Sequence, residues 1–461
     1  MVERRRKIQS SLAYRAESRG DAPMAERRGT EATKATSACE SPADTEGLME
    51  EVCEGRNIAI AQKHVQANKG SPGVDGMTVD ELPDFLWRHW PTLKDQLLTG
   101  TYTPQPVKRV EIPKPDGGVR KLGVPTATDR LIQQAVLQVL QRRWDRTFSP
   151  HSFGFRPKRS AHQAVARAQK YIGEGFRWVV DLDLEKFFDR VNHDILMGRV
   201  AQRVKDKRMR KLIRAFLNAG VMENGLVGPT DEGTPQGGPL SPLLSNLVLH
   251  DLDRELERRG LRFVRYADDC NIYVRSRRAG ERVMTRVTRY LTKRLKLKVN
   301  QEKSAVARPW QRKFLGFSFT SAKEPKRRIA PKALKRFKER VRELTRRTRT
   351  VGIGSMVQEL SRYLVGWQGY FGQCQTPSVL HALDGWIRRR LRCVIWKGWK
   401  RGRRRYAELR KLGIPQFQAA VAAGAPSGPW RMASHATVHT AIPDAFFVRL
   451  RLHQMAPWPY A

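Results

Sequence analysis

Hydrophobic and polar residues follow one another in patterns that predict both helices and strands. Residues 48–67 and 131–140 have apolar residues at helical spacing. Residues 176–184 and 263–275 are instead short runs rich in β-branched and aromatic residues, which is typical of strands. The second run includes two adjacent aspartates, which predicts a hairpin with an acidic tip.

The later part of the chain is predicted to be mostly helical. Residues 241–257 have one apolar face, with Ser241 placed to cap the helix and Pro242 in its first turn. Residues 283–296 predict a basic helix, and helices dominate from 330 to 412. Because strands and helices do not alternate strictly, the pattern indicates an α+β fold.

Composition changes this picture by pointing to a polyanionic partner. The 461 residues carry a formal net charge of +42, and a charge of that size is tolerable mainly when a polyanion neutralises it. Nucleic acid is the first candidate and an anionic membrane surface the second. No run of eighteen apolar residues predicts a membrane span, and none of the five cysteines forms a CxxC pair, so a reducing cytoplasm is expected.

The acidic hairpin tip reads YADD at 266–269. Aspartate is a poor strand residue, and a solvated turn is the common explanation for such a pair. A second acidic strand end stands at Asp181-Leu182-Asp183, where alternation places both carboxylates on one face. Alone, each pattern fits a surface turn or a salt bridge.

Brought side by side, the two strand ends would cluster three carboxylates. Such a cluster is unfavourable unless cations neutralise it, and magnesium prefers carboxylate oxygens together with substrate phosphates. Two ions would stabilise the attacking and leaving oxygens of a phosphoryl displacement. In a strongly basic protein this indicates nucleotidyl transfer on nucleic acid.

Seven ordered blocks between residues 50 and 320 resemble the reverse transcriptase domain of bacterial group II intron-encoded proteins. The resemblance implies a right-hand polymerase fold, with fingers and a palm containing an antiparallel sheet, followed by a helical thumb/maturase domain. The blocks are IPKPDGGVRKLGVPTATDR (112–130), HSFGFRPKRSAHQAV (151–165), VVDLDLEKFFDRVNHDIL (179–196), GTPQGGPLSPLLSNLVLHDLD (233–253), RYADDCNIYV (265–274), LKVNQEKS (297–304) and FLGFSF (314–319).

The same resemblance implies roles for individual residues. Asp183, Asp268 and Asp269 would be the catalytic residues and would hold two Mg²⁺ ions, which leaves Asp181 as a bystander. The resemblance also implies nucleotide-binding residues that bind the triphosphate, exclude a ribose 2′-hydroxyl or lie near the incoming nucleotide or primer end. These are Lys114, Arg120, Arg156, Phe188, Gln236 and Tyr266. An ordinary core phenylalanine is the alternative for Phe188.

A basic and aromatic stretch follows, and it resembles the thumb and maturase domain of the same proteins. Between Gly385 and Lys411 there are twelve Lys/Arg and one acid, Glu408. Cations of this density favour phosphate contacts, and aromatic rings can stack on unpaired RNA bases. The predicted RNA-binding residues are Trp386, Arg388, Arg389, Arg390, Arg392, Trp396, Lys397, Trp399, Lys400, Arg401, Arg403, Arg404 and Arg405.

The expected domain division has five parts, and no endonuclease is expected after the maturase domain. His435 and His439 stand four residues apart, but no third ligand is evident, so they are not predicted to bind zinc. The parts are a disordered or weakly helical leader (1–48), an N-terminal extension (49–105), fingers and palm (106–320), thumb and maturase domain (321–430) and a short tail (431–461).

The sequence therefore predicts an RNA-directed DNA polymerase that also binds its group II intron RNA, assists splicing and copies the intron. The expected partners are intron RNA, target and primer DNA and dNTPs, with no membrane and with a homodimer left open. Two alternatives remain: a splicing-only maturase, and a domesticated reverse transcriptase acting in defence or repair.

Overall fold

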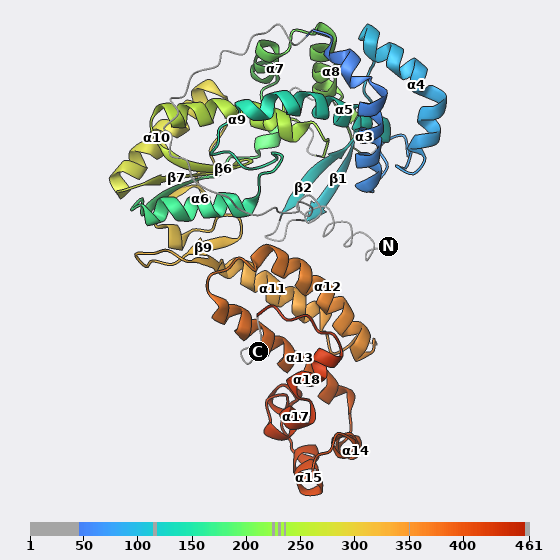
Figure 1. Cartoon of the computed structure of the whole chain (residues 1–461), viewed down its shortest axis with the longest axis vertical. Coiled ribbons are helices and arrows are strands. Elements are labelled where there is room, and N and C mark those ends of the chain that lie inside the picture. The colour runs from blue at the N-terminus through green and yellow to red at the C-terminus, as the bar shows by residue number, and fades with distance from the viewer. Residues whose placement is uncertain are drawn as a thin grey trace, which may run out of the picture. The chain divides into compact units, whose positions relative to one another are not determined.

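The computed structural model describes residues 46–113, 118–223, 226–228, 232–234, 237–349 and 351–456. The chain divides into two compact units, an N-terminal unit spanning Met1–Arg308 and a C-terminal unit spanning Pro309–Ala461 (Figure 1). The N-terminal unit mixes helices with two sheets, and the C-terminal unit is almost entirely helical. The predicted α+β class and the helical C-terminal region are confirmed.

The central sheet lies in the N-terminal unit and contains the predicted acidic strands. Its strand order is β6-β7-β3-β8, and every neighbouring pair is antiparallel. The predicted hairpin at 263–275 is confirmed as β6 and β7, and the strand predicted at 176–184 is β3. The bounds are Arg262–Tyr266 for β6, Asp269–Val274 for β7, Trp178–Leu182 for β3 and Ala305–Ala307 for β8.

A second four-stranded sheet has the order β2-β1-β4-β5. Its β1–β2 hairpin is antiparallel, with Ile112 opposite Arg120, and its turn contains residues 114–117, outside the described part of the chain. The strands are β1 (Val107–Pro113), β2 (Val119–Val124), β4 (Val221–Glu223) and β5 (Leu226–Gly228).

Helices cover the sheets of the N-terminal unit and build its core. Two of them, α5 and α9, are buried along most of their length, because apolar residues occur on nearly all sides. Helix α3 lies alongside α5 (Figure 1). The helices are α2 (Leu48–Val52), α3 (Gly55–Ala67), α4 (Leu82–Thr99), α5 (Ala127–Trp144), α6 (Ala161–Gly173), α7 (His193–Arg203), α8 (Lys207–Asn218), α9 (Ser241–Arg258) and α10 (Arg277–Arg294), with 3₁₀ turns at Asp145–Thr147 and Phe187–Asp189.

The start of α9 corrects one detail of the sequence interpretation. Leu240 is the N-cap residue and Ser241 is already the first helical residue, with Pro242 in the first turn as expected. No side-chain cap is present there. The Ser245 hydroxyl instead donates to the Ser241 carbonyl at 2.7 Å, inside the first turn. The loop before α9 therefore enters the helix without the predicted serine cap.

The C-terminal unit packs its helices around an aromatic core. Phe337 of α11 lies 4.3 Å from Trp367 of α12 between ring centroids, and Trp367 lies 4.7 Å from Phe371. The elements are β9 (Phe317–Phe319), β10 (Arg327–Ile329), α11 (Pro331–Leu344), α12 (Ile353–Phe371), α13 (Pro377–Gly398), α14 (Gly402–Lys411), α15 (Gln416–Gly424), α16 (Pro429–Met432), α17 (Ala436–Ala441) and α18 (Asp444–Arg449), with a 3₁₀ turn at Pro309–Gln311.

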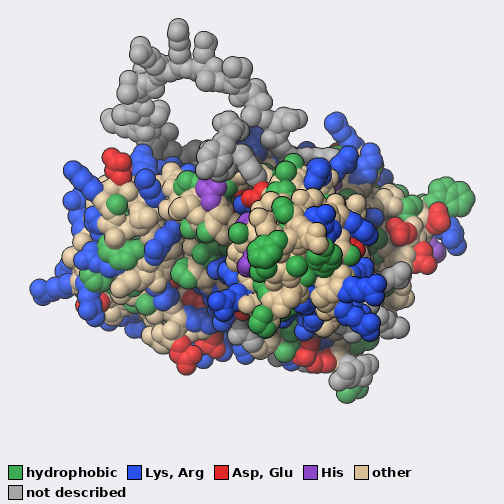
Figure 2. Space-filling model, turned by 90° about the horizontal axis from the view of Figure 1, so that it is seen from below, with side chains coloured by type: hydrophobic (Ala, Val, Ile, Leu, Met, Phe, Trp, Pro, Cys, Tyr) green, Lys and Arg blue, Asp and Glu red, His purple; other side chains and the backbone are tan. Residues whose placement is uncertain are grey.

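The surface shows the basic character that composition predicts. On the face in Figure 2, lysine and arginine side chains are spread widely, and acidic side chains occur in small groups. Among the described residues, no helix is both long enough and apolar enough to cross a membrane. The predicted leader lies almost wholly outside the described residues, and the five-part division of the chain stays a prediction.

Candidate active site

Pairing of β3 with β7 brings the two predicted acidic strand ends together. Leu182 lies opposite Cys270 in the antiparallel ladder, so Asp183, the next residue, faces the position of Asp269 just beyond the paired register. Residues directly opposite in such a ladder have Cα atoms about 4.5–5.5 Å apart. Asp181 lies further along, opposite Asn271. The predicted juxtaposition of the strands is confirmed.

The place where Asp183 meets the YADD turn, here called the carboxylate corner, is short of positive charge, as the pKa of Asp268 indicates. Burial raises the pKa of the Asp268 carboxyl, and the nearby Asp183 carboxylate raises it further. A backbone hydrogen bond and the guanidinium groups of Arg120 and Arg265 lower that pKa, but the upward effects are larger. A cation between Asp183 and Asp268 would relieve this cost.

Asp183 is fixed by the segment between α10 and β8. Its N–H donates to the Ser304 hydroxyl at 3.0 Å, and its carbonyl accepts from the Asn300 N–H at 2.8 Å. The Lys303 ammonium lies 3.7 Å from the Asp183 carboxylate. The LKVNQEKS block therefore positions the aspartate, a role that sequence reasoning did not assign to it.

The YADD tip is a tight two-residue turn. Tyr266 pairs with Asp269, which leaves Ala267 and Asp268 as the turn residues. Ala267 has φ of 56°, a left-handed conformation that favours glycine and costs a non-glycine residue about 1–3 kcal/mol. The neighbouring structure must therefore hold the turn in place. Tyr266 itself is partly exposed at the end of β6.

A buried arginine supplies that support. Arg265 is fully buried, and its Nη1 donates to the Ala267 carbonyl and to Asn246 Oδ1, both at 2.9 Å. Its Nε and Nη2 donate to the two carboxylate oxygens of Asp253 at 2.7 and 2.6 Å. Asp253 and Asn246 lie on α9, so this network ties the turn to the core helix. Sequence reasoning missed it, although all three residues stand inside the quoted blocks.

Gly154 lets the HSFGF segment approach the same turn. A Cβ atom on Gly154 would lie 2.2 Å from the Ala267 nitrogen, closer than atoms can approach. The Gly154 carbonyl accepts from Asn246 Nδ2 at 2.9 Å. The second block is therefore packed directly against the YADD turn.

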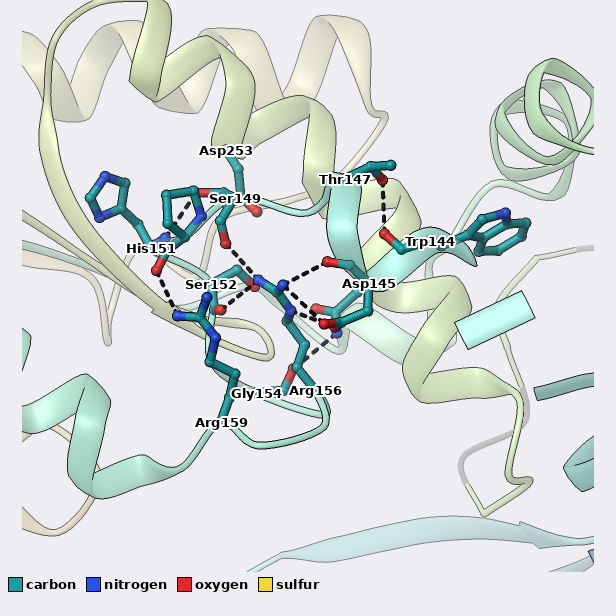
Figure 3. A network of polar contacts seen from close by, with 12 residues as sticks. Trp144, Asp145, Thr147, Ser149, His151, Ser152, Gly154, Arg156, Arg159 and Asp253 are labelled. Atoms are coloured by element: carbon teal, nitrogen blue, oxygen red, sulfur yellow. Dashed lines mark hydrogen bonds and ion pairs between the residues drawn. The ribbon is translucent and has the colours of Figure 1, made fainter. Parts of the chain in front are cut away.

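Arg156 corrects a predicted nucleotide contact. Its side chain is buried, and Figure 3 shows the guanidinium held among Asp145, Ser149 and Ser152. Nε donates to Asp145 Oδ1 at 2.8 Å, Nη1 donates to the Ser149 and Ser152 carbonyls, and Nη2 donates to the Asp145 carbonyl at 2.7 Å. With its donors used, Arg156 folds its own loop and cannot grip a triphosphate.

We expect Arg156→Lys to lower stability rather than nucleotide affinity. Lysine lacks the planar fork, so buried carbonyls lose partners at a cost of about 1–3 kcal/mol. Urea unfolding should show that loss, while KM for dTTP should change by less than about twofold. Arg159→Lys is the matched control in the same loop, because Arg159 donates one such bond, to the Pro150 carbonyl. A large rise in KM with stability unchanged would restore the original assignment.

The structure describes only some of the remaining predicted nucleotide-binding residues. Arg120 is exposed on β2 and lies close enough to Asp268 to affect its pKa, as a triphosphate-binding residue should. Lys114 and Gln236 lie outside the described residues. Phe188 is partly buried, with its ring centroid 5.3 Å from that of Phe187.

Phe188 is joined to the loop that carries Gln236. The Phe188 carbonyl accepts from the Thr234 N–H at 2.6 Å, and the Val191 carbonyl accepts from the Gly233 N–H at 2.8 Å. Gly233 has φ of 96°, and a Cβ there would lie 2.9 Å from the Phe188 carbonyl oxygen. The glycine is required for this close approach.

Several predicted RNA-binding residues in the C-terminal unit are interior. Trp396 is fully buried and Trp399 nearly so, so both belong to the core. Arg392 is 2% exposed and donates to the Ile442 carbonyl and to Asp444, and Arg388 also pairs with Asp444. The predictions for Trp396, Trp399 and Arg392 are wrong as RNA contacts, because a helix face rich in arginine can be covered by later helices. Arg388 has a partly exposed side chain, and its role stays a prediction.

The other predicted RNA contacts are accessible to different degrees, and their role stays a prediction. Trp386, Arg389, Arg390 and Arg405 are partly exposed. The exposed residues are Lys397, Lys400, Arg401, Arg403 and Arg404.

Metal-ligand geometry is incomplete in the residues that the structure describes. No group of three or more His, Cys, Asp or Glu side chains there is arranged to hold a metal ion. At the YADD corner the interaction of Asp183 with Asp268 provides two carboxylates, and Asp269 is exposed beside them.

Two families match successive parts of the chain. Residues 112–319 match the reverse transcriptase (RNA-dependent DNA polymerase) family. Residues 334–413 match the group II intron maturase-specific domain. The first range contains the carboxylate corner, and the second contains the whole basic and aromatic stretch from Gly385 to Lys411.

Curated relatives are similar to less than half of this chain. Protein YkfC of Escherichia coli (strain K12) is 39% identical over 220 residues, covering 46% of this chain and 58% of that protein. Group II intron-encoded protein LtrA of Lactococcus lactis subsp. cremoris is 40% identical over 207 residues, covering 45% and 34%. Retron Mx65 reverse transcriptase of Myxococcus xanthus is 31% identical over 210 residues, covering 43% and 47%. The aligned part is thus less than two thirds of each relative.

Proposed function

We propose that this chain, which joins a reverse transcriptase domain to a group II intron maturase-specific domain, is an RNA-directed DNA polymerase that also binds its intron RNA and assists splicing. The observation that carries the polymerase proposal is the β3–β7 register, which sets Asp183 beside the YADD turn. We further propose that the polymerase copies the intron during retrohoming.

The corner fits divalent cations by its chemistry. The Asp183 and Asp268 carboxylates repel each other, and oxygen ligands of this kind suit Mg²⁺. We propose that Asp183, Asp268 and Asp269 hold two Mg²⁺ ions, which would stabilise negative charge on the transferring phosphoryl group. The Lys303 ammonium, 3.7 Å from the Asp183 carboxylate, would compete with a cation for that carboxylate.

The reaction joins a deoxynucleotide to a primer. The primer 3′-hydroxyl oxygen bonds to the α-phosphorus, the bond to the bridging oxygen breaks, pyrophosphate leaves and the hydroxyl proton is lost. No protein nucleophile is needed, so the chain acts through positioning and electrostatics. Arg120, with Lys114, would bind the triphosphate, Gln236 would lie near the incoming nucleotide and Tyr266 beside the primer end.

Incorporation of dTTP on poly(rA)/oligo(dT) with magnesium tests the polymerase proposal. We expect template-dependent synthesis by the purified full chain. Absence of synthesis by folded protein that still binds RNA would favour the splicing-only alternative. Self-splicing of the cognate intron RNA at low magnesium, with and without protein, tests the maturase activity separately.

Phe188 is proposed to exclude ribonucleotides. It lies in the 3₁₀ turn after β3, its ring is partly buried beside Phe187, and its backbone carbonyl is bonded to Thr234 of the loop that carries Gln236. We propose that a sugar 2′-hydroxyl would meet this ring. We expect Phe188→Val to raise rNTP use relative to dNTP use by at least roughly tenfold, measured as a ratio of kcat/KM values. Phe187→Leu, a change in the buried neighbouring ring, is the control. An unchanged ratio in a folded Phe188→Val protein would mean that Phe188 is an ordinary packing residue.

The setting of the protein follows from these roles. We propose that it acts in the bacterial cytoplasm as part of a ribonucleoprotein, with target DNA, primer and dNTPs as further partners. We also propose that the fingers and palm occupy 106–320 and the thumb and maturase domain 321–430, as the sequence predicts.

A further inference from the structure

A pocket in the C-terminal unit combines arginines with indole rings. Its volume is about 330 Å³, and its walls include Arg342, Arg347, Trp386, Arg390 and Trp430. These residues come from α11, the segment after it, α13 and α16. Only Trp386 and Arg390 were predicted as RNA contacts, because the others lie outside the dense basic stretch.

Positive charge in this pocket is uncompensated. Arg342 and Arg347 are exposed, Arg390 is partly buried, and in the described part of the chain none of the three has a carboxylate within ion-pair distance. Burial lowers the pKa of Arg390, and the charges of Arg342 and Arg347 lower it further. An adjoining hollow shares all three arginines, and its two acids are Glu339 and Glu343.

Those acids do not neutralise the cluster. Glu343 accepts from Arg340 at 2.7 Å, so its charge is committed outside the pocket. Glu339 lines only the adjoining hollow. Three cations that face one space without a counter-charge repel one another, and an anion between them would be stabilised.

The walls are preorganised rather than loose. Arg390 Nε donates to the buried Thr345 hydroxyl at 2.8 Å, and that hydroxyl donates to the Val341 carbonyl at 2.6 Å. Trp430 is fixed by Arg389, whose guanidinium lies 4.1 Å from the ring centroid and donates to the Trp430 carbonyl. Binding to a preformed site loses little conformational entropy.

Trp386 provides an aromatic surface beside the cations. The guanidinium carbon of Arg390 lies 5.4 Å from the Trp386 ring centroid, and that of Arg342 lies 5.8 Å from it. Both distances are larger than the roughly 3.5–4.0 Å that separates carbon atoms in direct contact. Aromatic rings that stand next to arginines suit a nucleobase joined to a phosphate. The volume is near the lower end of small-ligand sites, roughly 300–1,000 Å³, so it suits one nucleotide rather than several.

We propose that this pocket receives one unpaired nucleotide of an RNA strand, with its base against Trp386 and Trp430 and its phosphate on Arg342, Arg347 and Arg390. The choice of RNA rests on the proposed maturase function. A base inside a duplex is stacked and cannot enter such a pocket, so the nucleotide must come from a bulge, loop or strand end.

Two RNA hairpins test this proposal, with the same stem closed by the same tetraloop, whose bases are stacked on one another. One stem is fully paired, and the other has a single bulged 2-aminopurine nucleotide, which is the one unstacked base. We expect the full chain to bind the bulged hairpin roughly tenfold more tightly, within the range that stacking of one base provides. Fluorescence of the bulged base should fall on binding, because stacking on indole quenches it. Trp386→Leu and the Arg342→Gln/Arg347→Gln double variant should both lose the preference.

Lys335→Gln/Arg336→Gln is the matched control. It removes two exposed charges from the same helix without touching the pocket lining, so overall affinity should fall while the preference for the bulge remains. Thermal melting checks that each variant is folded.

The outcomes separate the pocket from the proposed function. Equal binding of both hairpins by wild type would overturn the pocket assignment and leave RNA binding intact. An equal preference for a bulge in the matching DNA hairpin would overturn the choice of RNA. No binding to either RNA would count against both the pocket and the maturase proposal, while the dTTP assay would still judge the polymerase.

Discussion

Asp268→Asn is expected to reduce RNA-templated dTTP incorporation by about 10³-fold or more. Loss of a carboxylate that holds catalytic cations removes several kcal/mol of transition-state stabilisation, and each 1.36 kcal/mol is a factor of ten in rate. Asparagine keeps the size of the side chain, so the YADD turn and its support from Arg265 remain. The measurement is initial rate on poly(rA)/oligo(dT) at saturating magnesium.

The same substitution should leave the fold intact. Burial and Asp183 raise the pKa of Asp268, so its ionised form is disfavoured in the metal-free protein. Removing the charge should therefore keep or increase stability at neutral pH, as measured by urea unfolding without magnesium. Loss of activity in a protein that is at least as stable identifies a chemical role.

Asp181→Asn is the matched control for that experiment. Asp181 lies two residues from Asp183 on β3 but faces Asn271 within the ladder, away from the strand end. We expect it to retain most activity. If Asp181→Asn were as inactive as Asp268→Asn, or if Asp268→Asn remained active, the assignment of the carboxylate corner would be wrong.

Arg265→Met is expected to destabilise the N-terminal unit by about 3–5 kcal/mol, the cost of leaving one member of a buried ion pair uncompensated. Both side chains of the Arg265–Asp253 pair are fully buried, and their atoms approach to 2.6 Å. Methionine also leaves the Ala267 carbonyl and Asn246 without their donor. Urea or thermal unfolding of the full chain measures the loss.

Two further variants test whether the loss of stability in Arg265→Met comes from the buried ion pair. Arg258→Met breaks the surface pair with Glu255, in which Arg258 is 71% exposed, and should change the stability much less, because water screens an exposed pair. Arg265→Met combined with Asp253→Leu removes both charges and should recover much of the stability. It should not restore polymerase activity, because the turn still lacks its hydrogen bond to Ala267. Full recovery of activity would show that the network serves stability alone.

Local patterns in the sequence were enough to predict the strands and the carboxylate corner. Alternation and β-branched residues predicted β3 and the β6–β7 hairpin, because strand formation depends on neighbours within a few residues. The ordered blocks placed Asp183 and YADD in one site, and the β3–β7 register confirms that the two strands are adjacent. Basic composition likewise predicted a polyanionic partner without any knowledge of the fold.

Residues whose role depends on distant packing were misjudged. Arg156 and Arg392 were predicted to be exposed cations, but both are buried and bonded to backbone carbonyls and a carboxylate. The carboxylate partner of Arg392 is Asp444, 52 positions away in the sequence. Trp396 was predicted to stack on RNA bases, but its side chain lies in the core. A basic, aromatic helix has the same composition whether it faces RNA or a neighbouring helix, so only the covering elements distinguish the two.

The sequence by itself determined the class of fold, the strand ends that carry the aspartates and the basic character of the C-terminal unit, because these depend on residue type and short-range spacing. Only the tertiary structure decided which residues hold the YADD turn, since α9 has to pack against β6 before Asp253 and Asn246 reach Arg265. It also decided which arginines of the C-terminal unit are free to meet an anion. Both outcomes depend on burial, and burial is a property of the packed chain.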